Sequence, residues 1–119
     1  MRGGAVLWPA GQRYRSAVTQ PEVVVLCGSV RFAREHLAIH RSLSLTGCIV
    51  LLPALPVGDG TDFEATECLD SLHLRNIDLA DRVHLVNLDG YVGPSTQAEI
   101  AYAESRHKPV TYEWAEAHR

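Results

Sequence analysis

Glu99 is the side chain of this sequence best placed to act as a nucleophile. It closes the segment Gly93-Pro94-Ser95-Thr96-Gln97-Ala98-Glu99, in which a turn-rich loop passes into a predicted helix. The N–H groups in the first turn of a helix attract anions such as phosphate, and the helix dipole favours the ionised form of a nearby carboxylate. An ionised carboxylate at this place is able to attack an electrophilic sugar carbon.

The same spacing also allows a purely structural role for Glu99. Ser95 or Thr96 can cap the helix, and Thr96-x-x-Glu99 fits a capping box in which the carboxylate accepts a hydrogen bond from the Thr96 N–H. By spacing alone, the cap is the commoner use of this pattern. The position directly after a strand favours a reactive carboxylate instead, because ligands of parallel α/β proteins bind there. Both interpretations stay open.

A second segment, Gly28-Ser29-x-Arg31, follows the first predicted strand. Glycine permits close approach of the backbone, serine caps or donates, and arginine can bind phosphate with two hydrogen bonds. The alternative for Arg31 is an exposed residue in the first turn of a helix. A single glycine is no dinucleotide-binding motif, and the segment lacks the lysine of a Walker loop. NAD and ATP sites are therefore disfavoured, and no cofactor is expected.

Asp70 and His73 are spaced i, i+3 on a predicted helix, so their side chains can meet. A histidine tuned by a carboxylate is a candidate proton donor or acceptor, and the alternative is a surface pair. Asp59, Asp62 and Glu64, in or beside a Pro- and Gly-rich loop, offer a second acidic group, although such residues are more often solvated turn formers.

The cysteines Cys27, Cys48 and Cys68 are widely spaced and odd in number. This suits neither a disulfide framework nor a Cys-x-x-Cys zinc site, so the sequence predicts reduced thiols and no metal site. Cys27 ends a predicted strand and is expected in the core rather than as a nucleophile, because no partner base is evident beside it.

Four apolar runs and three longer segments position these side chains. The predicted strands are 22–26, 48–52, 83–88 and 108–112, and the predicted helices are 30–46, 64–80 and 95–106. Gly47 is expected to end the first helix. One stripe of the second helix comprises Leu69, Leu72, Asn76, Leu79 and Ala80.

Strands that alternate with helices predict an α/β fold. We expect a three-layer Rossmann-like or flavodoxin-like domain with a parallel sheet of four strands, or five. Ligands of such folds bind outside the carboxyl ends of the strands, which points to the loops after Leu26, Leu52 and Leu88. The loop at 53–61, with its Pro and Gly residues, is expected to be mobile over the site.

Composition limits the classes of protein to consider. A chain of 119 residues fits one domain, here 21–119, after an irregular leader at 1–20. The formal net charge of −3 and the absence of a dense Lys/Arg run disfavour nucleic acid as a partner. No run of about 18 apolar residues occurs, so no membrane span is expected and the protein is placed in the cytoplasm.

Two blocks and a short closing motif resemble the nucleoside 2-deoxyribosyltransferase family. The blocks are Val25-Leu26-Cys27-Gly28-Ser29-Val30-Arg31 and Gly93-Pro94-Ser95-Thr96-Gln97-Ala98-Glu99-Ile100-Ala101-Tyr102-Ala103, and Lys108-Pro109-Val110 closes the pattern. The resemblance spans about residues 22 to 112. It is nearest to the branch of nucleoside 5′-monophosphate N-glycosidases, which includes deoxynucleoside monophosphate hydrolases and cytidylate hydrolases of antibiotic pathways.

This resemblance implies a retaining glycosidase without a cofactor or a metal. Glu99 would attack the anomeric carbon, the base would leave, and water or a second base would resolve the glycosyl-enzyme. A nucleoside or nucleotide is thus the implied partner. Because members of this family commonly form oligomers, the resemblance also implies a homodimer or a larger homo-oligomer. The implied substrate-binding residues are Gly28, Ser29, Arg31, Gly93, Ser95 and Thr96.

Two positions differ from the pattern of the hydrolase branch. Val25 stands where those relatives have a tyrosine, and His73 stands where the simplest alignment puts an aspartate. Three hypotheses follow: His73 assists the leaving base, Asp70 does so, or the protein binds or senses nucleotides without cleaving them. A phosphoreceiver domain is disfavoured, because Cys27-Gly28-Ser29 occupies the place of its acidic pair.

Overall fold

The computed structural model describes residues 19–55 and 63–115. They form a four-stranded, all-parallel sheet in the order β2-β1-β3-β4, which confirms the predicted α/β fold with Rossmann-like or flavodoxin-like layers. The elements in chain order are β1 (Val23–Gly28), η2 (Val30–Phe32), α2 (Ala33–Leu45), β2 (Ile49–Leu51), α3 (Phe63–Leu79), β3 (Arg82–Val86), η3 (Leu88–Gly90), α4 (Pro94–Ser105) and β4 (Val110–Tyr112).

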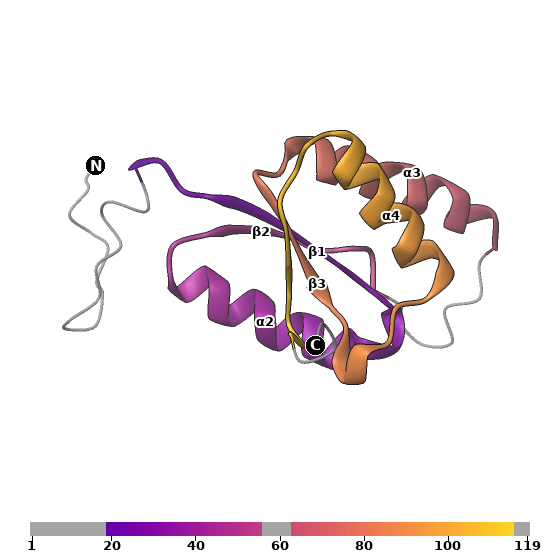
Figure 1. Ribbon diagram of the computed structural model, residues 1–119, viewed down its shortest axis with the longest axis horizontal. Coiled ribbons are helices and arrows are strands. Elements are labelled where there is room, and N and C mark those ends of the chain that lie inside the picture. Colours follow the sequence, from indigo (N-terminus) through magenta and orange to yellow (C-terminus); the bar gives the residue numbers. More distant parts are fainter. Residues whose placement is uncertain (1–18, 56–62, 116–119) are drawn as a thin grey trace.

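The sheet is covered on both faces, by α2 on one side and by α3 and α4 on the other (Figure 1). Strand β1 contributes side chains to the hydrophobic cores on both faces of the sheet, because successive side chains of a strand point to opposite faces. Val25 and Cys27 belong to the core under α3 and α4, whereas Val24 and Leu26 belong to the core over α2. All four side chains are fully buried, as expected of a central parallel strand.

The order of the strands creates a switch point between β1 and β3. From β1 the chain moves outward to β2, and it then returns across the sheet to pair β3 with the other edge of β1. Gly28 pairs with Val86, so the carboxyl ends of the two strands lie side by side. The loops that follow them therefore open at the crevice where ligands of such folds bind.

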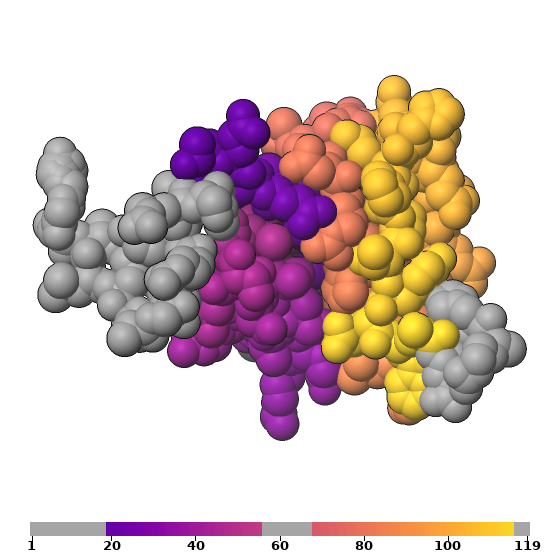
Figure 2. Space-filling model, turned by 60° about the vertical axis from the view of Figure 1, so that its left-hand side comes forward, coloured from indigo at the N-terminus to yellow at the C-terminus, as the bar shows by residue number. Residues whose placement is uncertain are grey.

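The predicted boundaries hold to within a few residues. The helix expected at 30–46 is divided into the 3-10 turn η2 and the α-helix α2, and it ends as predicted before Gly47, which has a φ of 97°. The segment after β4 is tied to the end of β3 by buried Asn87. Its side chain accepts from the Trp114 N–H at 2.8 Å and donates to the Trp114 carbonyl at 3.2 Å. Figure 2 shows the late residues (yellow) running alongside β3 (orange).

The predicted stripe of α3 is buried only in part: Ala80 belongs to the core, but the three leucines are exposed. Leu69, Leu72 and Leu79 have exposures of 41%, 55% and 69%, while the buried side of the helix carries His73 and Ile77. The spacing of apolar residues does not distinguish the leucine row from the row of His73 and Ile77, because the two rows are adjacent on the surface of the helix. The leucines therefore form a surface row beside the core.

Several predictions fall on residues that are not described. The leader at 1–20 lies almost wholly outside the described residues, as do Asp59, Asp62 and most of the loop expected over the site. The backbone of Glu64 is helical, but its side chain is not described. None of the described helices is both long enough and apolar enough to cross a membrane.

Gly28→Ala is expected to destabilise the fold by about 1–3 kcal/mol, the usual cost of overpacking. A Cβ at this position would lie 2.6 Å from the Val86 carbonyl oxygen, which belongs to the paired strand and cannot move aside. Urea unfolding measures the change, with Ser42→Ala on the exposed side of α2 as control. Equal stability of Gly28→Ala and wild type would contradict this reading of the β1–β3 contact.

Candidate functional site

A cavity of about 210 Å³ opens at the carboxyl ends of β1 and β3. Every predicted site residue except Arg31 lines it: Gly28, Ser29, Asp70, His73, Gly93, Ser95, Thr96 and Glu99. The remaining lining residues, which the sequence analysis did not single out, are Val30, Pro53, Ala54, Leu69, Tyr91 and Pro94. The topology thus brings together residues from β1, α3 and α4 that are up to 71 positions apart in the chain (Gly28 to Glu99).

The floor of the cavity is the turn that follows β1. Ser29 is the N-cap of η2, and its Oγ accepts a hydrogen bond from the Arg31 N–H at 3.2 Å, as predicted for a capping serine. Gly28 is needed because the strand passes so close to Val86. His36, fully buried in α2, lies behind this glycine, with its ring 3.3 Å from the place of a Cβ on Gly28.

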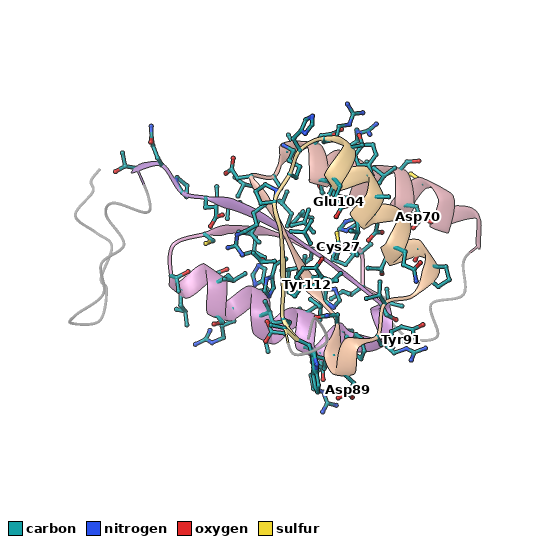
Figure 3. All side chains as sticks on the ribbon, in the orientation of Figure 1. Cys27, Asp70, Asp89, Tyr91, Glu104 and Tyr112 are labelled. Atoms are coloured by element: carbon teal, nitrogen blue, oxygen red, sulfur yellow. The ribbon has the colours of Figure 1, made fainter. Side chains whose placement is uncertain are left out.

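Arg31 is placed beside the cavity by Tyr91. Its exposed guanidinium lies 4.1 Å from the centroid of the Tyr91 ring, a cation–π contact, and Phe32 packs edge-on against the same ring at 6.1 Å. Figure 3 shows Tyr91 below α4, next to the start of the chain segment that leads into α2. The sequence analysis missed Tyr91, and its only signal was an aromatic residue within a turn-rich loop.

Helix α4 presents its amino-terminal end to the cavity without a capping side chain. The helix begins at Pro94 with Gly93 as N-cap, so the predicted caps by Ser95 or Thr96 are wrong. The Gln97 N–H donates the first bond of the helix, to the Gly93 carbonyl at 2.9 Å, and Pro94 has no N–H. The N–H groups of Ser95 and Thr96 thus precede the intrahelical ladder and form the anion-attracting end of the helix.

Glu99 takes part in a compact cluster instead of a capping box. His73 Nε2 lies 3.4 Å from Cys27 Sγ and 3.9 Å from Glu99 Oε1. The Cys27 thiol also lies within 4.8 Å of the Glu99 carboxylate. The three side chains come from β1, α3 and α4, and Figure 3 shows Cys27 between the sheet and the helices above it.

Burial dominates the charge state of Glu99. The side chain is 17% exposed, and loss of hydration raises its pKa to about 7, with a smaller rise from the charge of Asp70 and a reduction from the Cys27 hydrogen bond. Burial therefore outweighs the expected effect of the helix dipole on this carboxylate. Near neutral pH the protonated and ionised forms are both populated.

His73 is held in the neutral form. Its side chain is 5% exposed, and burial, together with the nearby His36, lowers its pKa. The Leu26 carbonyl lies close enough to favour the protonated ring, yet Nδ1 makes no regular hydrogen bond within the described residues. Asp70 is exposed at the cavity, and no hydrogen bond or ion pair joins it to His73 in the described part of the chain. Asp70 therefore affects His73 only through its charge, which raises the pKa of the imidazole.

Cys27 is in the core, as predicted, but it does have a partner base. The residue is fully buried, and burial and the Glu99 charge raise the pKa of the thiol well above its usual range. A protonated, buried thiol is a poor nucleophile. Cys27 Sγ, His73 Nε2 and a Glu99 oxygen all lie within 4.8 Å of one another, a set able to hold a metal ion. Sequence spacing gave no sign of this set, because each ligand comes from a different element.

The function of this chain has to be inferred from the geometry of the site. No protein-family model and no curated protein matches this chain.

Glu99→Gln is expected to stabilise the protein by about 1–3 kcal/mol near pH 8, and the gain should shrink toward zero below pH 4.5. The folded pKa of Glu99 lies above its unfolded value, so its stabilising contribution is complete below 4.5 and lost as the pH rises through about 7. Glutamine keeps the neutral shape at every pH. Urea unfolding across this range, with EDTA present, measures the difference between the two proteins.

Glu104→Gln is the matched control, because Glu104 is exposed on the same helix. This substitution removes one negative charge from α4 without replacing a buried carboxyl group. A Glu99→Gln difference that did not vary with pH, or that matched the control, would contradict a raised pKa for Glu99.

Proposed function

We propose that this protein hydrolyses the N-glycosidic bond of a nucleoside 5′-monophosphate, with Glu99 as the nucleophile. One observation carries the proposal: a largely buried carboxylate and an uncapped helix start face the same cavity. The helix start suits a phosphate, and the carboxylate suits an anomeric carbon held a few ångströms away. The resemblance to nucleoside 2-deoxyribosyltransferases supports the same assignment.

In the proposed reaction, an ionised Glu99 oxygen forms a bond to C1′ of the sugar as the C1′–N bond to the base breaks. The electron pair of that bond leaves with the base, which takes up a proton. Water then attacks C1′ and releases the sugar 5-phosphate and Glu99. Transfer to a second base instead of water would give a new nucleotide by the same intermediate.

Asp70 is the better candidate than His73 to assist the leaving base. Asp70 is exposed at the mouth of the cavity, whereas the His73 Nε2 is directed at Cys27 and Glu99. We therefore assign His73 to positioning Glu99.

The cavity volume bears on how the substrate lies. Pockets that enclose a whole small-molecule ligand have volumes of about 300–1,000 Å³, and this one has about 210 Å³. It suits the sugar and its 5′ group, with the base directed outward past Asp70. The phosphate is placed at Ser95 and Thr96, within reach of Arg31 on its Tyr91 support.

Glu99→Gln is expected to reduce base release from nucleoside monophosphates by at least about 1,000-fold, because the amide cannot form the glycosyl-enzyme. Asp70→Asn is expected to slow release by about 100-fold or more, the usual contribution of a general acid. Glu104→Gln should react like wild type. Chromatography of a panel of ribo- and deoxynucleoside monophosphates, with and without an added acceptor base, measures hydrolysis and transfer.

The pH profile gives a further readout. Attack requires ionised Glu99, so the rate should rise as the pH increases through about 7. Nucleotide binding by calorimetry without base release would contradict catalysis and favour the alternative, a nucleotide-sensing module. Lack of both binding and release across the panel would contradict the assignment to nucleotides.

We also propose that the protein is a cytoplasmic homodimer, or a larger homo-oligomer, with neither nucleic acid nor membrane as a partner. The exposed leucine row of α3, formed by Leu69, Leu72 and Leu79, supports association. Leu69 also lines the cavity, so a second copy packed on this row would border the site.

Leu72→Glu is expected to convert the oligomer to monomers, because a charge would be buried in the contact. Size-exclusion chromatography with light scattering over a range of concentrations measures the mass. Leu37→Glu is the matched control, since Leu37 is 54% exposed on α2 and Leu72 is 55% exposed on α3. A monomeric wild type, or equal effects of both variants, would contradict association through α3.

A further inference from the structure

Cys27, His73 and Glu99 have the chemistry of a binding site for a soft or borderline divalent cation. A thiolate, an imidazole nitrogen and a carboxylate oxygen are the three ligand types that Zn²⁺ accepts in proteins, whereas Mg²⁺ and Ca²⁺ prefer oxygen alone. Two of the three residues are almost completely buried, with exposures of 0% for Cys27 and 5% for His73. Packing against the sheet thus holds the sulfur and nitrogen ligands in place.

The distances between these atoms match a tetrahedral metal site. Zinc bonds of about 2.3 Å to sulfur and about 2.0–2.1 Å to nitrogen and oxygen separate S from N by about 3.6 Å and N from O by about 3.4 Å. The observed separations are 3.4 Å for Cys27 Sγ to His73 Nε2 and 3.9 Å for His73 Nε2 to Glu99 Oε1. The third pair, Cys27 Sγ and the Glu99 oxygen, lies within 4.8 Å.

Charge favours the same conclusion. With Cys27 as thiolate, Glu99 as carboxylate and His73 neutral, the two negative charges are cancelled by one dication. Without a cation, burial opposes both negative charges. Binding transfers the proton of the thiol, and that of Glu99 where present, to solvent.

The fourth position of such a site would open into the cavity, since Glu99 and His73 both line it. From these observations we propose that Cys27, His73 and Glu99 bind a zinc-like divalent cation, and that this cation and a nucleotide exclude each other. The first half is independent of the proposed activity. The second half rests on it, because competition follows only if the nucleotide requires a free Glu99.

Cobalt(II) titration of the metal-free, reduced protein tests the first half. We expect one Co²⁺ per chain and a sulfur-to-cobalt charge-transfer band in the near ultraviolet, and competition with a chromogenic chelator should give the Zn²⁺ affinity. Cys27→Ser should abolish the band, and Cys68→Ser, which alters an exposed thiol, should leave it unchanged. A missing band in wild type, or a band lost in Cys68→Ser and kept in Cys27→Ser, would overturn the site.

Glu99→Gln and His73→Gln keep the test decisive if Cys27→Ser fails to fold. Loss of orienting neighbours of a ligand costs about 10–100-fold in metal affinity, so loss of a ligand should cost at least that much. Circular dichroism establishes that each variant is folded. Zn²⁺ affinity that is unchanged in both folded variants would exclude Glu99 and His73 as ligands.

The competition is tested by adding a nucleoside monophosphate to the Co²⁺ complex. We expect the charge-transfer band to fall as nucleotide is added, and Zn²⁺ to inhibit base release in proportion to its occupancy. A band that persists with saturating bound nucleotide would overturn the exclusion and leave the metal site standing. Metal binding, together with no base release from any nucleotide by the metal-free protein, would instead refute the proposed function alone.

Discussion

Strand β1 must remain covered on both faces and paired along both edges, and the rest of the molecule is arranged around that requirement. It pairs with β2 on one edge and with β3 on the other, and its residues from Val24 to Cys27 are fully buried. A polar side chain within this stretch would need a partner inside the core. The chain can therefore change from apolar to polar residues only where β1 ends, and Gly28 and Ser29 stand at that point.

Near the end of β1, three titratable side chains of low exposure gather within the described part of the chain. His36 approaches Gly28 from the α2 side, and His73 and Glu99 approach Cys27 from the other side. Each of these groups is shielded from water, so each is driven toward its uncharged form. The result is a site in which burial opposes charge on its own side chains.

Helix α3 has a side packed against the sheet and an exposed side with a row of leucines, and the sequence pattern does not distinguish the two. Its inner side carries His73 and Ile77 against the sheet, and its outer row of leucines is exposed. Because Asp70 and Leu69 lie on the same turn at the mouth of the cavity, any molecule that covers the leucines also alters access to the site. The proposed assembly and the proposed ligand binding would in this way be connected through a single helix.

The sequence alone predicted the order of strands and helices along the chain, the parallel sheet and the edge of the sheet at which the cavity opens. These follow from local patterns: apolar runs, Gly and Pro at the ends of elements, and the constraint that parallel strands need crossover helices. It also identified Gly28 and Ser29, at the end of β1, and Glu99, near the start of α4, as candidate site residues. Only the tertiary structure decided that Glu99 faces His73 instead of capping α4, that Tyr91 supports Arg31, and that Cys27 has partners. Those contacts join elements far apart in the chain, and the burial that raises the pKa of Glu99 exists only when β1, α3 and α4 are packed together.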